Sequence, residues 1–493
     1  MRFEQHPSGR PPVAWRPVLG VVAVTAMVHL LLAIRFGWHR DEFYYVICGR
    51  HLDWGYVDQP PLAPLLARLA ADLPGGVLPL RLLAITAQIG CIPLASVLAA
   101  ELGGRRRAQT LAAAAVAACP VFVAASMLFG TTVLDQLAWV AVLVLTARAL
   151  RLRSTRVWLA AGAVAGLGLQ TKDTLAVLLI GIAVGLVLFR RDALYSRGPW
   201  LACGMAILIA TPNIVWDARH RWANLLMARE LAGQQGGAVG ALTHLPTLVL
   251  LLAGPPLIVL WYAGVRQLLS RAGDDHRWLL AATIMVVLLF TISGGKVYYA
   301  APALAGLFAA GAVRVETAAT ARGRFGWPAA VAAAAIIAIV IGLPVLPPRA
   351  ETALRPIDPQ PMETYGWPRF VDQIARAAAP LPADVPIFTS NYGEAGAVTI
   401  LGPARGLHRQ VLSGHNNYLL WGPPPGTPDT VLCVGQWDPG YLHRFWSKVT
   451  EVEPITLPAG LTDQETARHA AIYLCTQPRG TWAQLWPGLR HLD

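Results

Sequence analysis

Apolar stretches of nearly twenty residues recur through the first 346 residues of this chain and then stop. A helix of that length crosses the hydrocarbon core of a bilayer. The composition agrees, because 55% of the residues are hydrophobic and only 14% are charged, against roughly 25% in a soluble domain. These features exclude an ordinary soluble globular protein and predict a polytopic α-helical membrane protein.

We expect about eleven membrane spans. The first apolar run resembles a signal peptide, but it is too long and lacks a small-residue cleavage site, so we interpret it as a retained helix. The expected spans lie at about 17–36, 77–101, 109–126, 133–150, 157–170, 174–189, 199–215, 241–262, 278–293, 298–313 and 327–346.

The basic residues fix the expected orientation. The formal net charge is +12, but the arginines lie between apolar runs and not on a face with stacking aromatics, which argues against a nucleic-acid partner. Alternate loops, beginning with the N-terminal one, hold roughly twice as many Lys and Arg residues as the others, and such loops stay in the cytoplasm. An odd number of spans then exports the C-terminal segment.

The last part of the chain, residues 347–493, differs in composition from the membrane domain of residues 1–346. It begins with a Pro-rich segment and continues with short strand-like runs such as VPIFTS and DTVLCVGQW, separated by Gly, Pro and Asn. We expect a small extracytoplasmic α/β domain. Cys433 and Cys475 both lie in it, and one exported disulfide is left open.

The first external loop holds the most informative residues. Asp41 and Glu42 follow the first membrane helix directly, and acids at that depth are candidates for function. The alternative is that Asp41 caps a helix that starts at Glu42. Downstream, YVDQPPLAPLLARL suits an amphipathic segment lying at the membrane interface.

Further polar residues are expected at the same membrane face. They are Asp135 in FGTTVLDQLAW, Lys172 and Asp173 in GLQTKDTLA, and Lys296 with Tyr298 in ISGGKVYYAA. A carboxylate can accept the proton of an attacking hydroxyl, and an ammonium group can neutralise a departing phosphate. The pattern therefore fits transfer chemistry on a lipid phosphate, although each lysine alone could merely snorkel to the headgroups.

The segment HRDEFYYVICGRHLDWGYVDQPPLAPLLARL resembles the first-loop signature of the family 39 glycosyltransferases. These are GT-C membrane enzymes related to the dolichyl-phosphate-mannose protein mannosyltransferases and bacterial aminoarabinose transferases. The similarity continues in order through FGTTVLDQLAW, AGLGLQTKDTLAVLL, TPNIVWDARHRW, ISGGKVYYAAPALAGLFAAGA, SNYGEAGAV and SGHNNYLLWGPP, so it covers nearly the whole chain.

The resemblance implies an inverting transfer of a sugar from a polyprenyl-phosphate donor to an acceptor hydroxyl on the outer face of the membrane. The Ala-, Arg- and Gly-rich composition suggests a bacterium with GC-rich DNA, and hence a bacterial plasma membrane. It implies that Asp41 is the general base, with Glu42 and Asp135 as further catalytic acids. Lys172 and Lys296 would bind the donor phosphate. In relatives the lysine segment commonly reads Asn-Lys-Tyr-Thr, whereas here it is Thr-Lys-Asp-Thr, which keeps the lysine and loses the tyrosine.

The matching segments also supply candidates for binding the acceptor or the sugar. They are Tyr44, Tyr45, Asp58, Tyr298, His415, Asn416 and Asn417. For the tail residues among them, ordinary packing is the alternative. No cofactor is required by the pattern. A divalent metal is left open, with His39, His51 and His415 as ligands that show no spacing signal.

Two other functions are consistent with parts of the sequence. A transporter or flippase of lipid-linked sugars would suit the many spans, but it usually shows two related halves, and none is evident here. An inactive relative that serves as a binding protein is suggested by the altered TKDT segment. The sugar and the acceptor, whether protein, glycolipid or polysaccharide, are not specified by these motifs.

Overall fold

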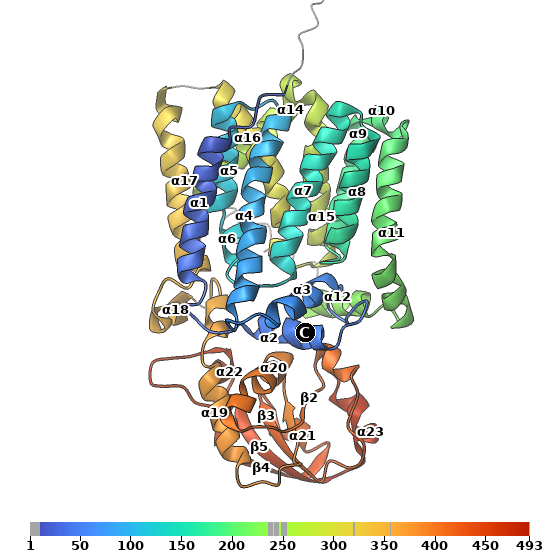
Figure 1. Cartoon of the computed structure of the whole chain (residues 1–493), viewed down its shortest axis with the longest axis vertical. Helices are drawn as coiled ribbons and strands as arrows, with labels where there is room; N and C mark the ends of the chain where they lie inside the picture. The colour runs from blue at the N-terminus through green and yellow to red at the C-terminus, as the bar shows by residue number, and fades with distance from the viewer. Residues whose placement is uncertain are drawn as a thin grey trace, which may run out of the picture.

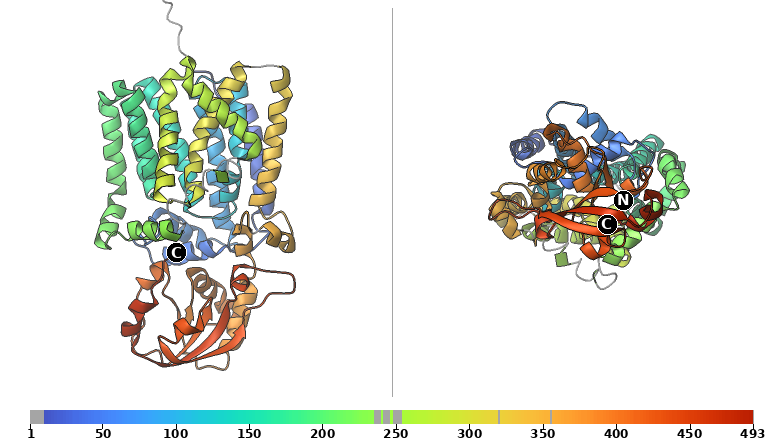
Figure 2. Two further views of the ribbon diagram at one scale, coloured as in Figure 1. Left: turned by 180° about the vertical axis from the view of Figure 1, so that it is seen from behind. Right: turned by 90° about the horizontal axis from the view of Figure 1, so that it is seen from below.

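The structure is a computed structural model that describes residues 10–234, 254–318, 321–354 and 356–492, together with Gly240, Pro246 and Thr247. A bundle of roughly parallel helices forms one end of the molecule, and a smaller part built on a β-sheet forms the other (Figure 1). A layer of short helices lies between them, as the view from behind also shows (Figure 2).

Within the described residues, six helical segments are long and apolar enough to cross a membrane. They comprise α1 (Trp15–Leu32), α4 (Leu78–Glu101), α7 (Thr131–Leu152), α11 (Arg197–Arg219), η3 with α15 (Arg271–His276 and Arg277–Ser293), and η4 with α16 (Val297–Ala303 and Leu304–Thr317). Shorter helices complete the bundle: α5 (Arg106–Ala118), α6 (Pro120–Ala125), α8 (Thr155–Leu169), α9 (Leu175–Phe189), α10 (Arg191–Leu194), η2 (Pro255–Leu257), α14 (Ile258–Leu269) and α17 (Ala321–Gly342). The chain is therefore a membrane protein.

The helices lie close to the expected spans, with one difference and one gap. The span expected at 109–126 is two helices, because Cys119 adopts an extended conformation before Pro120, as residues before proline tend to do. The span expected at 241–262 lies mostly outside the described residues, which include only η2 and the start of α14 near its end. The total of eleven crossings therefore stays a prediction.

The intermediate layer is built from the loop that follows α1 and two later segments (Figure 1). It contains α2 (Arg40–Arg50), α3 (Leu62–Ala71), α12 (Ala223–Gln234) and α18 (Pro348–Leu354). One face of α3 is buried, including Ala63 and Ala67, while Leu65 and Leu69 are exposed. That pattern agrees with the expected amphipathic segment.

The C-terminal part contains a five-stranded mixed sheet with the order β2-β1-β3-β5-β4. β1 pairs in parallel with β2 and β3, whereas β5 pairs antiparallel with β3 and β4. The strands are β1 (Ile387–Thr389), β2 (Val411–Ser413), β3 (Thr430–Gly435), β4 (Trp446–Pro454) and β5 (Ala471–Pro478). The expected strands VPIFTS and DTVLCVGQW correspond to β1 and β3.

Helices and short turns cover both faces of this sheet. On one face α19 (Trp367–Ala378) and α20 (Tyr392–Leu401) pack on apolar residues of β1, β3 and β5. On the other face a tryptophan-rich cluster packs on the alternate residues, as a sheet with both faces buried requires. The remaining elements are η5 (Gln360–Thr364), η6 (Pro403–Arg405), η7 (Asn416–Leu419), α21 (Pro439–Leu442), α22 (Gln464–Ala467), α23 (Trp482–Leu485) and η8 (Trp486–Leu489).

Cys433 and Cys475 are free thiols buried on neighbouring strands. Cys433 lies opposite Tyr473, and Cys475 lies opposite Val431. The two cysteines are thus offset by two residue pairs in the antiparallel ladder. The disulfide left open by the sequence is not formed.

Candidate active site

The first turn of α2 is held by a capping box. The backbone N–H of Asp41 donates to His39 Nδ1 (3.1 Å), and the N–H of His39 donates to Glu42 Oε2 (2.9 Å). The cap is therefore His39, and the helix begins at Arg40. The alternative that Asp41 caps the helix is wrong, so its side chain is available for other contacts.

Glu42 is fully buried, and both of its oxygens are occupied. Arg81 on α4 donates from Nε to Oε1 (2.5 Å) and from Nη2 to Oε2 (2.8 Å). The backbone N–H of Phe129 adds a third donor from outside α2. This bidentate pair is the strong form of a charge-assisted hydrogen bond. It joins the first loop to the bundle and leaves no surface of Glu42 for a substrate.

Asp41 differs from its neighbour, because its side chain keeps 34% of its surface exposed. Its Oδ1 accepts a hydrogen bond from the Tyr392 hydroxyl at the start of α20 (2.8 Å). Burial opposes ionisation, but His39, Arg40 and the Tyr392 hydroxyl together hold the pKa of Asp41 below its ordinary value. Asp41 is therefore an accessible carboxylate at neutral pH.

Two glycines explain how α20 comes close enough to reach Asp41. A Cβ atom at Gly396 would lie 2.6 Å from Cβ of Phe43, and one at Gly393 would lie 2.7 Å from Cβ of Arg40. Real Cβ atoms do not approach that closely, so only glycine allows this contact between α20 and α2. The motif NYGEAGAV thus sets the distance between the two helices.

Lys172 lies in the turn between α8 and α9. Its Nζ donates to Thr132 Oγ1 on α7 (3.0 Å) and lies 4.6 Å from the ring centroid of Tyr299 and 5.3 Å from that of Tyr298. Lys296 precedes η4 and is half-buried. Both lysines are electrostatic neighbours of Asp41.

Asp135 on α7 is buried and has two neutral donors. Trp139 Nε1 donates to Oδ1 (2.9 Å), and Thr174 Oγ1 donates to Oδ2 (2.7 Å). Thr174 stands two residues after Lys172, so Asp135 fixes the turn that carries the lysine. Asp41, Asp135, Lys172, Lys296 and Tyr298 thus gather in one region, as electrostatic neighbours.

The other expected binding residues form the junction between the first loop and the C-terminal part. The Tyr44 hydroxyl donates to Asp58 Oδ1 (3.0 Å) and accepts from the N–H of Asn417 (3.2 Å). Asn416 Nδ2 donates to Asp58 Oδ2 (3.1 Å). Burial raises the pKa of Asp58 to about 7 in spite of these donors.

Tyr45 and His415 are also committed to protein contacts. The Tyr45 hydroxyl accepts from the N–H of Thr131 (3.3 Å). His415 is buried, accepts from the N–H of Tyr392 at Nδ1 (3.2 Å), and stacks on that tyrosine with ring centroids 4.7 Å apart. In this arrangement His415 positions Tyr392, which contacts Asp41.

The histidines named as metal candidates do not meet. His39 Nε2 lies 3.2 Å from Glu363, His51 stacks on Trp421, and His415 lies inside the C-terminal part. Across the described ranges, no group of three or more His, Cys, Asp or Glu side chains is placed to hold a metal ion.

Sequence reasoning missed two residues that shape the site. Tyr392 donates a hydrogen bond to Asp41, and its ring lies under the Arg40 guanidinium, with Cζ of Arg40 4.7 Å from the ring centroid. It lies in a motif that was singled out, but nothing in the sequence connects it to a residue 351 positions earlier. Arg81 had a visible signal, because it is a lone arginine in an apolar run and needs a buried partner.

Known proteins resemble this chain in sequence and in fold. The family of dolichyl-phosphate-mannose-protein mannosyltransferases matches residues 58–216. None of the curated proteins matches the chain. ArnT from Cupriavidus metallidurans bound to undecaprenyl phosphate has a similar structure, with a TM-score of 0.62, 14% identity, and coverage of 93% of this chain and 97% of that one.

Two further solved structures are similar. ArnT from the same organism in the apo state gives a TM-score of 0.61 at 15% identity, with the same coverage of both chains. The Archaeoglobus fulgidus oligosaccharyltransferase in complex with Zn and sulfate gives 0.47 at 15% identity and covers 79% of this chain and 62% of that one. The resemblance seen in the sequence is thus confirmed: this chain has the GT-C fold of membrane glycosyltransferases and is similar to the dolichyl-phosphate-mannose-protein mannosyltransferases.

Proposed function

We propose that this chain is a glycosyltransferase of a bacterial plasma membrane that moves a sugar from a polyprenyl-phosphate donor to an acceptor hydroxyl. The fold shared with ArnT, a protein whose structure contains undecaprenyl phosphate, supports the lipid-linked donor. One observation carries the proposal most directly. A partly exposed, ionised Asp41 lies near Lys172 and Lys296 at the end of the bundle that meets the C-terminal part.

The reaction is a single displacement. The acceptor hydroxyl attacks the anomeric carbon of the donor sugar, its proton passes to Asp41, and the bond between that carbon and the phosphate oxygen breaks. The electron pair leaves with the polyprenyl phosphate, whose charge Lys172 and Lys296 neutralise. Because one displacement occurs at the anomeric carbon, its configuration inverts.

Glu42 and Asp135 have positioning roles in this proposal. Glu42 holds the start of α2 through Arg81, and Asp135 holds the turn of Lys172 through Thr174. Tyr392 orients the Asp41 carboxylate from the opposite side. The sequence suggested catalytic roles for both acids. Because both are buried and their oxygens already accept hydrogen bonds from the protein, we propose instead that they hold Asp41 and Lys172 in place.

The orientation in the membrane follows the arginine distribution. The Arg-rich connection at α10 lies at the end of the bundle away from the C-terminal part (Figure 1), and basic loops favour the cytoplasm. We therefore propose that the N-terminus is cytoplasmic and that residues 347–493 form an extracytoplasmic α/β domain. The active site then faces the outer leaflet, where a flipped lipid-linked donor is available.

Transfer of radiolabelled sugar from a panel of polyprenyl-phosphate sugars tests the proposal. In membranes that contain the Asp41→Asn variant, the transfer rate should fall at least about 100-fold, since general bases contribute roughly 10²–10⁴-fold to a rate. Lys172→Ala should lose about 10²–10³-fold. Asp384→Asn and Lys448→Ala change exposed residues of the C-terminal part and serve as matched controls.

The product also reports on the mechanism. The anomeric configuration, read by nuclear magnetic resonance, should be opposite to that of the donor. Retention would contradict the single displacement. If no donor is consumed in sealed vesicles while labelled lipid becomes accessible on the outer face, the chain is a flippase and the proposal is refuted.

A further inference from the structure

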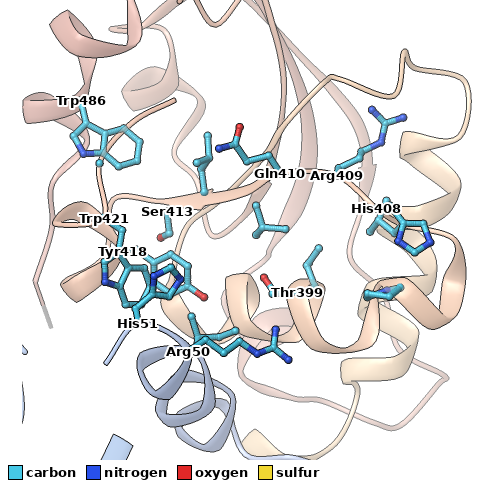
Figure 3. Close-up of a pocket in the computed structure, with 17 residues that line it drawn as sticks. Arg50, His51, Thr399, His408, Arg409, Gln410, Ser413, Tyr418, Trp421 and Trp486 are labelled. Atoms are coloured by element: carbon cyan, nitrogen blue, oxygen red, sulfur yellow. The ribbon is translucent and has the colours of Figure 1, made fainter. Parts of the chain in front are cut away.

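A cavity that does not include Asp41 lies between the C-terminal half of α2 and the sheet domain. Its volume is about 400 Å³, and it is lined by α2, α20, residues 403–410, β2 and the segment that follows β2 (Figure 3). This volume falls in the range of small-molecule pockets, roughly 300–1,000 Å³. The cavity therefore has room for a saccharide unit.

The charged residues of the cavity have one sign. Its lining includes Arg50 and Arg409, with the imidazoles of His51 and His408, and no aspartate or glutamate. Arg409 already donates to carbonyl oxygens at the end of α19, including Ala378 and Leu381, but carbonyls do not neutralise its charge. An anion in this cavity would meet no opposing carboxylate.

Arg50 is the cation that remains available. It ends α2, its side chain is exposed, and within the described part of the chain it makes no hydrogen bond or ion pair. Gln410 and His408 are likewise exposed, and no side-chain hydrogen bond occupies them among the described residues. These three groups can all donate to a ligand, and Gln410 can also accept.

Aromatic rings form one wall of the cavity. His51 stacks on Trp421 with centroids 4.3 Å apart, and Tyr418 meets Trp421 edge-on at 4.7 Å. Figure 3 shows these three rings together on one side of the cavity, with His408 and Arg409 on the other. Flat rings beside polar groups suit a ligand that has both an apolar face and many hydroxyls.

A row of rings connects this cavity to Asp41. Tyr392 donates to Asp41, and its ring centroid lies 4.5 Å from that of Tyr44. The ring centroid of Tyr44 in turn lies 6.4 Å from that of Tyr418. Asp41 and Arg50 stand at the two ends of α2, about 14 Å apart along the axis at 1.5 Å per residue. An acceptor that reaches both Asp41 and this cavity must span at least that distance.

We propose that the cavity beside Arg50 and Trp421 binds an acidic saccharide unit of the acceptor, one that bears a carboxylate or a phosphate. The inference rests on the proposed function for its acceptor role. Arg50 binds the anionic group, and Trp421 supports the sugar ring. The acceptor of this enzyme is then an acidic glycan and not a neutral one.

Binding to the full chain in nanodiscs, without donor, tests the site. The probes are a glucuronate-containing tetrasaccharide, the same tetrasaccharide with its carboxyls reduced to alcohols, and a tetrasaccharide with one phosphate monoester. Dissociation constants come from saturation-transfer NMR titrations. Wild type should bind at least one acidic probe at least ten-fold more tightly than the reduced one, and the preferred acid identifies the anionic group.

The variants locate the binding. Arg50→Gln and Trp421→Ala should each weaken binding of the acidic probe at least ten-fold. Arg369→Gln, which changes an exposed arginine on α19, should leave it unchanged. Equal binding of acidic and reduced probes, or an equal loss in Arg369→Gln, would overturn the proposal. This binding assay needs no donor. A failed transfer assay would therefore count against the proposed function but not against this site.

Discussion

Replacing Arg81 with methionine separates a positioning role of Glu42 from a catalytic one. The substitution leaves the Glu42 carboxylate intact but removes its two charge-assisted bonds in a site where Arg81 is 2% exposed and Glu42 is fully buried. Removing one partner of such a pair costs about 3–5 kcal/mol of unfolding free energy, because the remaining charge is buried and uncompensated. Arg81 also donates to the carbonyl of Gly37 (3.1 Å), which adds to the loss.

Glu42→Gln and the double variant with Arg81→Met test whether the two residues stabilise the fold as a pair. Glu42→Gln keeps an oxygen that can accept from the N–H of His39 or Phe129, but it leaves Arg81 charged, so we expect a loss of about 3 kcal/mol. In the double variant Glu42→Gln/Arg81→Met no charge is left unpaired. Its loss should therefore be smaller than the sum of the single losses by about 0.5–3 kcal/mol.

Reversible unfolding in mixed micelles measures these free energies, and transfer assays run in parallel. If the interpretation is correct, activity per folded molecule in the double variant stays within about ten-fold of wild type. Wild-type stability of Arg81→Met would refute the buried-pair reasoning. Complete loss of activity in a fully folded Glu42→Gln variant would instead support the catalytic role that the sequence suggested.

Two further predictions concern pH. Tyr392→Phe removes a hydrogen bond that favours the charged form of Asp41, so the pKa of Asp41 should rise. The acid limb of the pH profile of the transfer rate should then move to higher pH. An unmoved limb would show that Tyr392 does not act through Asp41. Burial raises the pKa of Asp58 from its ordinary 3.8 to about 7, so the folded state binds more protons than the unfolded state and loses stability as pH rises from about 4 through 7. Asp58→Asn should flatten that dependence in unfolding measurements, and an equally steep dependence in the variant would contradict the assignment.

The membrane part could be predicted from the sequence because its signal is local. The apolar runs at α4, α7 and α15 are long, and each lies within a few residues of its expected position. The break at Pro120 was missed because its flanking residues are as apolar as a continuous span. Hydropathy averages over a window and does not register the conformation of a single residue before proline.

The site was predictable where chemistry alone identified a residue. Asp41 and Lys172 are charges next to membrane helices, and charges are rare there. The different surroundings of Asp41 and Glu42 were not predictable, since they depend on Arg81 from α4 and Tyr392 from α20. Similarly, Asn416 and Asn417 looked like sugar-binding residues, but their contacts with Asp58 and Tyr44 join the two parts of the protein.

The contact between Tyr392 and Asp41 has a consequence for biosynthesis. Asp41, the proposed general base, is made early, yet its partner Tyr392 emerges from the ribosome 351 residues later. Helix α20 also rests on a sheet whose strand β5 is later still. Until that sheet has formed outside the membrane, the helices can be inserted while the catalytic group lacks its hydroxyl partner. If the proposed function and orientation hold, a nascent chain would reach the lipid-linked donor before it is competent to use it, and export of the last domain would be the step that switches the enzyme on.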